Sequence, residues 1–405
     1  MLFGGGGSKL QVAGLFAGIG GIELGLGIKF ETLLFCEIDP GAKAVLQARF
    51  PGVPLWDDVS SLPSIPARAE VLTAGFPCQD LSQAGKTAGI GGTRSGLVSH
   101  MFELLKPARG GRNGPTWVVI ENVRNMLSLD RGRAMEYLVG ELEALGYAWA
   151  YRVVDTRALG LPQRRQRVLL VASRTEDPRG VLLTEDVGEP PVDHYRQDGF
   201  GFYWTEGLRG LGWAQDAIPT LKGGSSLGIP SPPAIWVPDG ERGRQFVLPS
   251  IEEAEMLQGF PRGWTEPAGH EKVRKGDRWK MVGNAVSVPV AGWLGSRLLR
   301  PLSYQGHQAS RVETGESWPL AAWGAPRADR YRVDLSMWPQ RAKYRHLLQL
   351  VDVKLARALS QRATAGFLSR LERSYLRTPD QFRMDLRSHL QVRNEIPDGQ
   401  LALTS

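Results

Sequence analysis

Short apolar runs alternate with stretches of helical spacing along the first part of the chain. The runs that predict strands are Leu10–Leu15, Phe30–Cys36, Val71–Phe76, Trp117–Ile120, Ala148–Val154 and Val168–Ala172. Apolar residues recur at helical spacing from about Ile22, over Gly41–Arg49 and over Arg133–Leu145. Strands that alternate with helices predict an α/β fold with a doubly wound, mostly parallel sheet over residues 10–172.

The pattern changes beyond residue 172. Residues 173–242 are rich in proline, glycine and aromatic residues, which predicts a small irregular domain inserted into the chain. The chain then returns to the core over 243–300, where Ser250 is the expected N-cap of a helix over Pro249–Gln258. A further helix is expected after Val286, ending near Arg300.

The two ends of the chain lie outside this core. Residues 1–9 indicate a flexible lead because glycines dominate them. Residues 301–405 predict a mainly helical extension, with an amphipathic helix over Lys343–Leu371. Charge indicates a class of partner. The net charge is +7, and most of the excess of lysine and arginine over acids lies in 301–405. A basic surplus favours a polyanion as partner.

Several classes of protein are disfavoured. Apolar runs are far too short to span a membrane, and no charged segment followed by an apolar one opens the chain as a secretion signal would. Two cysteines cannot form a disulfide framework, and no Cys/His spacing indicates zinc or another metal site. A protein of the reducing cytosol fits these features.

The candidate chemistry lies where strands end, since ligands of such sheets bind at carboxyl ends. Cys78 follows Pro77 directly after the strand Val71–Phe76, and a glycine-rich polar stretch, Gln79–Leu97, follows in turn. A thiol there is placed to attack a molecule that enters a cleft. The alternative is a small core residue, because free cysteine is often buried.

A second set of strand ends predicts a nucleoside cofactor. The turn Leu15–Gly21 contains three glycines that allow close backbone approach, but it lacks the spacing of a pyrophosphate-binding turn. Glu37 ends the next strand, where an acid can accept from ribose hydroxyls. Asp58 and Val59 would hold an adenine ring, although Asp58 alone is more often a surface or capping residue. S-Adenosylmethionine fits this combination.

Taken in order, these segments resemble the cytosine-C5 DNA methyltransferases. The matching segments are Phe16–Gly21, Pro77-Cys78-Gln79, Glu121-Asn122-Val123, Gln163-Arg164-Arg165-Gln166-Arg167, Leu257-Gln258-Gly259-Phe260-Pro261 and Gly283-Asn284-Ala285-Val286. Each segment alone is a weak match, but the ordered set is specific. The resemblance covers residues 10–300 and leaves the last hundred unmatched. It implies the fold of S-adenosylmethionine-dependent methyltransferases.

The resemblance implies roles for individual residues. Cys78 would add to C6 of cytosine, and Glu121 would hold N3 and the exocyclic amine. Arg165 would contact the cytosine O2, and Arg167 would brace the site. The cofactor would be held by Phe16, Gly18, Gly20, Gly21, Glu37, Ile38, Asp58, Val59, Pro77, Asn284 and Ala285. One departure is Gly14, where many relatives have an acid.

The resemblance also implies contacts with double-stranded DNA. Gln79–Leu97 would be a mobile catalytic loop, in which Gln79, Ser82, Lys86 and Arg94 contact the DNA. Residues 173–242 would form the target-recognition domain, with Thr220 and Leu221 against the DNA. The target base would leave the stack at a cost of a few kcal/mol. We expect a monomer on DNA.

The predicted function is methyl transfer from S-adenosylmethionine to C5 of cytosine in a short DNA sequence, for restriction–modification or phage self-protection. Three alternatives stay open: a tRNA cytosine-C5 methyltransferase, a catalytically silent DNA-binding regulator, and transfer of a modified methyl group. The intact Cys78, Glu121 and Arg165 argue against the regulator.

Overall fold

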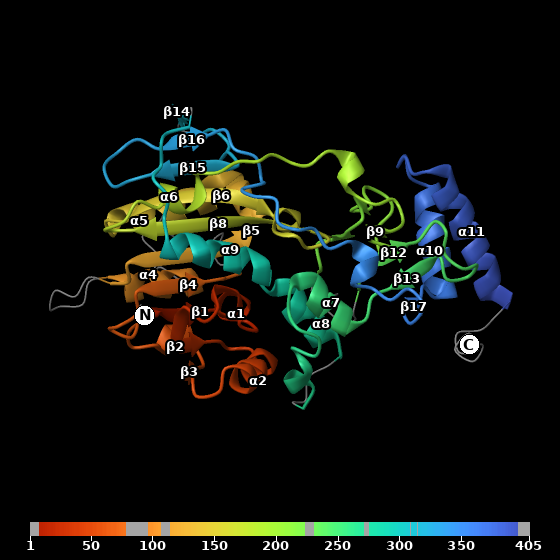
Figure 1. Ribbon diagram of the computed structural model, residues 1–405, viewed down its shortest axis with the longest axis horizontal. Coiled ribbons are helices and arrows are strands. Elements are labelled where there is room, and N and C mark those ends of the chain that lie inside the picture. Colours follow the sequence, from red (N-terminus) through yellow and green to blue (C-terminus); the bar gives the residue numbers. More distant parts are fainter. Residues whose placement is uncertain are drawn as a thin grey trace, which may run out of the picture. The chain divides into compact units, whose positions relative to one another are not determined.

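The computed structural model describes residues 8–77, 96–106, 114–222, 231–270, 275–307, 309–313 and 315–395. The chain divides into two compact units (Figure 1). The first unit comprises residues 1–159, 166–189 and 285–342, and the second comprises 160–165, 190–284 and 343–405. Among the described residues, no helix is long and apolar enough to cross a membrane.

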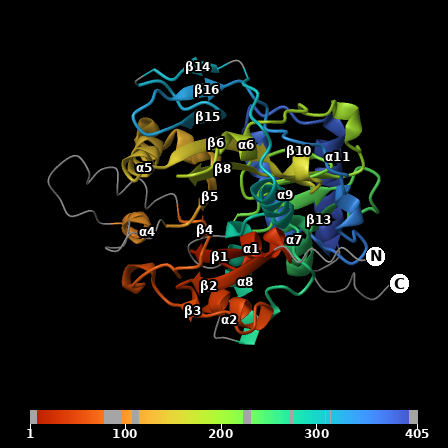
Figure 2. The ribbon, with the colours of Figure 1, turned by 60° about the vertical axis from the view of Figure 1, so that its left-hand side comes forward.

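A ten-stranded mixed sheet forms the centre of the first unit, in the order β14-β16-β15-β6-β8-β5-β4-β1-β2-β3 (Figure 2). Its parallel half runs from β3 to β5. The strands of this half are β1 (Leu10–Leu15), β2 (Phe30–Cys36), β3 (Leu55–Trp56), β4 (Val71–Ala74) and β5 (Trp117–Val123). Their carboxyl ends meet at one edge of the sheet, where Phe16, Glu37 and Glu121 lie.

The other half of the sheet is antiparallel. It contains β8 (Gln166–Ser173), β6 (Ala148–Asp155), β15 (Ala321–Gly324), β16 (Tyr331–Val333) and β14 (Ala309–Arg311). The prediction of a mostly parallel sheet therefore holds only for the first half. No helix of crossover length separates β6 from β8, and a parallel pair would need such a crossover.

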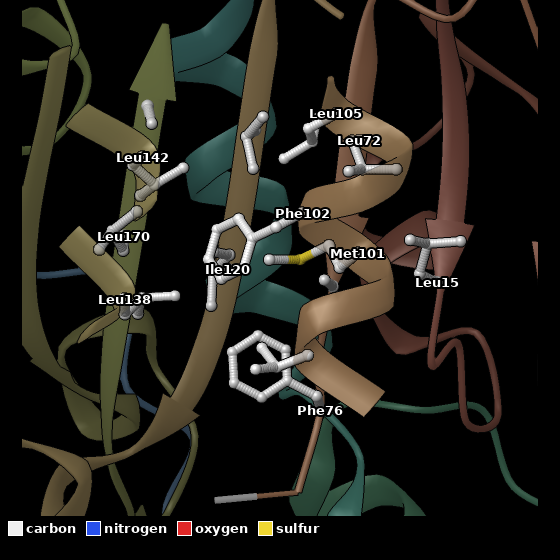
Figure 3. Packing of buried hydrophobic residues seen from close by; sticks show 14 of the residues in the cluster. Leu15, Leu72, Phe76, Met101, Phe102, Leu105, Ile120, Leu138, Leu142 and Leu170 are labelled. Atoms are coloured by element: carbon white, nitrogen blue, oxygen red, sulfur yellow. The ribbon is translucent and has the colours of Figure 1, made fainter. Parts of the chain in front are cut away.

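Helices cover both faces of this sheet. On one face, α4 (Leu97–Leu105) and α5 (Arg133–Ala144) bury an apolar core that includes Met101, Phe102 and Leu138 (Figure 3). On the other, α1 (Gly21–Leu26), α6 (Arg179–Leu182) and α9 (Val288–Leu299) pack together. Helix α2 (Pro40–Arg49) follows β2, and Asp39 caps it by accepting from the Ala42 N–H at 3.0 Å. This cap explains why the helix begins at Pro40, directly after Asp39.

The second unit contains two small sheets. The larger has the order β10-β9-β12-β13-β17 and the smaller pairs β11 with β7. The strands are β7 (Gln163–Arg164), β9 (Phe200–Phe202), β10 (Ala214–Gln215), β11 (Ile218–Pro219), β12 (Ala234–Trp236), β13 (Phe246–Leu248) and β17 (Arg357–Ala358). Its helices are α7 (Ile251–Gln258), α8 (Lys275–Asn284), α10 (Gln361–Glu372) and α11 (Asp380–Glu395).

The last hundred residues are not one helical extension. Residues 309–333 contribute strands to the sheet of the first unit, whereas 357–395 complete the second unit with β17, α10 and α11. The helix predicted over Lys343–Leu371 exists only from Gln361 onward. Before it, the backbone N–H of Leu347 and the side chain of Tyr344 bond to Asp216, so this stretch takes distant partners in place of helical ones.

Candidate active site

An ion pair lies at the carboxyl end of β5. Glu121 is 6% exposed, and its Oε1 lies 3.0 Å from Nε of Arg167, which β8 brings alongside through the pairing of Val123 with Arg167. A Cβ added to Gly75 would lie 4.0 Å from Glu121 Oε2 and 3.9 Å from the Phe16 carbonyl. The ends of β1, β4 and β5 thus meet around one carboxylate.

Asn122 fixes the segment that leads into the predicted nucleophile. Its Nδ2 donates to the Phe76 carbonyl at 3.0 Å, and its Oδ1 accepts from the Val123 N–H at 2.9 Å. Phe76 also packs edge-on against Phe16, with ring centroids 6.0 Å apart. The chain is therefore well anchored up to Pro77. The predicted Cys78, Gln79, Ser82, Lys86 and Arg94 lie outside the described residues.

The turn after β1 is joined to the end of β2 by Glu37. Its Oε2 accepts from the Gly18 N–H at 2.7 Å and its Oε1 from the Asp39 N–H at 2.8 Å. Burial raises the pKa of Glu37, and these backbone donors counteract the rise. Gly18 has φ +55°, and a Cβ added there would meet no atom within 4 Å. Phe16 and Gly20 also adopt positive φ, and Gly21 opens α1.

This turn fits an adenosyl cofactor. An ionised carboxylate can accept about four hydrogen bonds, and the two backbone donors leave Glu37 able to accept from a ribose diol. The open space beside Gly18 admits a ligand close to the backbone. The exposed Ile38, at 66%, offers an apolar surface next to it.

Asp58 and Val59 fit the adenine prediction less well. Asp58 caps a 3-10 turn by accepting from the Ser60 N–H at 2.8 Å, and this bond lowers the pKa of Asp58. Val59 is 5% exposed and belongs to the apolar core. The capping alternative therefore describes Asp58 in this structure, and Val59 has little surface for a ring.

Cys36, the other cysteine of the chain, is not suited to nucleophilic attack. It is 2% exposed at the end of β2. Burial raises the pKa of its thiol to about 12, and the charges of Glu37, Asp58 and Asp57 add to the rise. Cys78 is the only other thiol of the chain.

The arginine-rich segment begins inside the second unit. Gln163 is fully buried there, and its Nε2 donates to Gln258 Oε1 at 2.6 Å and to the Leu257 carbonyl at 3.0 Å. Arg165 is also fully buried, and its guanidinium donates to the Gly283 carbonyl at 2.9 Å. Arg164 is exposed and donates to the Trp213 carbonyl. These partners of Gln163 and Arg164 are far away along the chain, so local sequence patterns do not predict them.

Thr220 and Leu221 lie beside this segment in the second unit. Thr220 Oγ1 donates to the Arg164 carbonyl at 3.0 Å, and the Leu221 N–H donates to Gln163 Oε1 at 3.3 Å. Leu221 is 2% exposed, so its side chain packs inward. Asn284 is the exposed last residue of α8, and Ala285 is buried in the first unit. Their cofactor role stays a prediction.

Glu23 is a polar residue that the sequence did not single out. It lies in the first turn of α1 and is 7% exposed, and its Oε1 accepts from Thr73 Oγ1 at 2.8 Å. Burial raises its pKa to about 6. A Cβ on Gly14 would lie 2.7 Å from the same oxygen. The Glu23 carboxylate thus occupies the space that an acid at position 14 would need.

Comparison with known proteins defines the family. A model of the family described as C-5 cytosine-specific DNA methylase matches residues 10–198. The type II methyltransferase M2.BsuMI of Bacillus subtilis (strain 168) is 46% identical over 374 residues, which span 90% of this chain and 94% of that protein. M.NgoBI of Neisseria gonorrhoeae is 30% identical, over 68% of this chain and 89% of its own length. The chain therefore belongs to the C-5 cytosine-specific DNA methylases.

The enzyme is accordingly a DNA (cytosine-5-)-methyltransferase. Among solved structures, the S. pombe Dnmt2 methyltransferase matches with a TM-score of 0.52 at 18% identity, over 73% of this chain and 100% of that one. At this identity the likeness bears on the fold alone, which is the mixed α/β fold of such methyltransferases.

Proposed function

We propose that this enzyme transfers a methyl group from S-adenosylmethionine to C5 of a cytosine in a short DNA sequence, through covalent addition of Cys78 to a base rotated out of the helix. The observation that carries the proposal is the Glu121–Arg167 pair beside Gly75, three residues before Cys78. The Glu37–Gly18 turn of the same unit supports the cofactor.

The proposed reaction needs a nucleophile because C5 of cytosine reacts poorly. The Cys78 thiolate adds to C6, while Glu121 holds the proton that N3 takes up, and the ring becomes an enamine. S-Adenosylmethionine, when bound, supplies a methyl group on a sulfonium centre. After C5 has gained the methyl group, its proton leaves to solvent, the Cys78 thiolate is expelled and N3 returns its proton to Glu121, which restores the aromatic ring.

We propose that Arg165 and Arg167 exchange the roles that the sequence predicts for them. Arg167, which was expected to brace the site, pairs directly with Glu121. Arg165, which was expected to contact the base, is fully buried and donates to the Gly283 carbonyl. We therefore assign Arg167 to the base and to the orientation of Glu121, and Arg165 to the packing of the second unit.

A trapping experiment tests this function. The full chain is incubated with S-adenosylmethionine and a duplex that carries 5-fluorocytosine, whose C5 substituent cannot leave as a proton. We expect a covalent adduct that peptide mass spectrometry locates on Cys78, and none with Cys78→Ser. The matched control is Cys36→Ser, which should still form the adduct. An adduct on Cys36, or methylation by Cys78→Ser, would contradict the mechanism.

The nucleic acid and the biological context need a separate test. The relatives named as type II methyltransferases support DNA modification in a restriction–modification system. Labelled methyl groups should enter duplex DNA and not tRNA, and bisulfite sequencing of the host genome should give one short sequence methylated throughout. Label found only in tRNA would replace the DNA assignment.

A further inference from the structure

The C-terminal residues are an integral part of the second unit. Strand β17 pairs with β13. Phe367 of α10 and Phe382 of α11, both fully buried, pack against Phe202 of β9 with ring centroids 5.1 and 5.3 Å apart. Residues that the family resemblance left unmatched therefore share one core with the predicted target-recognition domain.

Contacts connect α10 to the loop between β9 and β10. Arg370 of α10 donates to the carbonyls of Trp204 and Glu206, both at 2.8 Å. At Gly207, where φ is +116°, a Cβ would lie 3.2 Å from the Phe367 ring. The loop and the carboxyl-terminal half of α10 thus form one surface, from which Arg209 projects as an exposed residue.

The same loop contacts the predicted DNA-binding segment. Tyr203 Oη donates to the Thr220 carbonyl at 2.6 Å. Lys222 lies 3.7 Å from the centroid of the Tyr203 ring and forms an ion pair with Glu206. Direct contacts within the second unit therefore connect Thr220 to α10 through this loop. The charge of Glu206 in the loop is neutralised by Lys222.

The turn after α10 is exposed and basic. Arg373 and Arg377 are exposed there, and Tyr375 between them is fully exposed, at 103%. Arg383 of α11 holds the turn by donating to Thr378 Oγ1 and to the Leu376 carbonyl, both at 2.9 Å. The turn contains no acid; the adjacent Glu372 pairs with Arg387, and Asp380 opens α11.

We propose that Arg209, Arg373, Arg377 and Tyr375 form a second DNA-contacting surface, the basic rim, which binds phosphates of the duplex beside the recognised sequence. Among the described residues, neither Arg209 nor Arg377 is in an ion pair, so their charge is available to a polyanion. Phosphate contacts set orientation and affinity but carry no sequence information. The rim rests on the proposed function, because it extends the DNA contact of the same enzyme.

Salt dependence of binding tests the rim. Kd is measured for the full chain at salt concentrations from about 50 to 200 mM. One duplex contains the sequence that the enzyme methylates, and the other contains a scrambled sequence. For Arg373→Ala/Arg377→Ala we expect the slope of log Kd against log salt to fall by about 2. The ratio of its Kd to that of the wild type then changes about tenfold across this range. Both duplexes should be affected alike.

Two further variants serve as controls. Arg373→Lys/Arg377→Lys keeps the charge and should keep most of the slope. Arg68→Ala/Arg327→Ala removes two exposed arginines of the first unit and should leave the slope unchanged. An unchanged slope in the rim variant, or an equal loss in the Arg68/Arg327 control, would overturn the rim while the DNA assignment stands. A wild type that binds tRNA but no DNA would overturn both.

Discussion

Arg167 and Glu121 form a 3.0 Å ion pair across the neighbouring strands β8 and β5, and the carboxylate is 6% exposed. The antiparallel register places both side chains at the same edge of the sheet. The pair lies near Gly75, so in the reaction that we propose the base would meet a carboxylate that an arginine already holds. This relationship, rather than motif order, distinguishes Arg167 from Arg165.

Replacing each arginine should give different defects. Arg167→Ala should lower kcat about 100-fold, because Glu121 loses its orientation during proton transfer. Arg165→Ala should instead lower the stability of the second unit, by about 1–3 kcal/mol, because a buried carbonyl loses its donor. Single-turnover methylation per folded molecule and thermal unfolding separate the two effects. A larger single-turnover defect in Arg165→Ala would restore the original assignment.

The two cysteines should differ in reactivity. At pH 7.5, burial and the raised pKa of about 12 keep Cys36 as an unreactive thiol. Iodoacetamide should therefore label Cys78 and leave Cys36 unmodified until the protein is unfolded in denaturant. Peptide mass spectrometry quantifies both sites. Equal labelling of Cys36 in the folded protein would show that the end of β2 opens readily.

Glu23 should make stability fall as the pH rises. Its pKa is raised from 4.5 to about 6 by burial, so the folded state holds a proton that the unfolded state has lost between these values. Its contribution is therefore most favourable below pH 4.5 and is lost through pH 6, by about 2 kcal/mol in total.

Glu23→Gln removes this dependence. The difference in unfolding free energy between variant and wild type should shift by about 2 kcal/mol in favour of the variant from pH 4.5 to 7.5. Comparing two pH values cancels any constant cost of the amide. Urea unfolding of the cofactor-free protein measures it, with exposed Glu31→Gln as the control. A constant difference across this range would contradict the raised pKa.

Local signals predicted four of the five strands of the parallel half, but not the two-residue β3. Strands β1 and β2 have the predicted bounds. In the second unit, helix α7 begins after Ser250, the expected N-cap, which forms a capping box with Glu253. The family motifs then allowed a cofactor site to be proposed at the turn after β1, because the residues of this turn are close together along the chain.

Long-range contacts account for what the sequence did not predict. Residues 343–360 have a helical pattern, yet Tyr344 and Leu347 bond to Asp216, more than a hundred residues earlier. Strand β15 pairs with β6 at a similar separation. The exchange of roles that we propose for Arg165 and Arg167 has the same cause, since it rests on their contacts with Gly283 and Glu121. The pattern of apolar and polar residues within one segment does not reveal which distant residues will be its partners.

Phe382 tests whether the C-terminal helices belong to the second unit in energetic terms. It is fully buried and contacts the rings of Trp213, Phe202 and Trp236 at centroid distances of 5.2 to 5.3 Å. Phe382→Ala should destabilise this unit by about 3–5 kcal/mol, because the cavity is lined by rigid aromatic rings.

Binding measurements on Phe382→Ala show which of the two units the substitution affects. DNA affinity should fall, whereas S-adenosylmethionine affinity, measured by calorimetry, should stay near that of the wild type, because Gly18 and Glu37 belong to the first unit. Exposed Met384→Ala, from the same helix, is the matched control and should change neither. If Phe382→Ala left DNA binding intact, the packing of α11 on the five-stranded sheet would not be required for DNA binding.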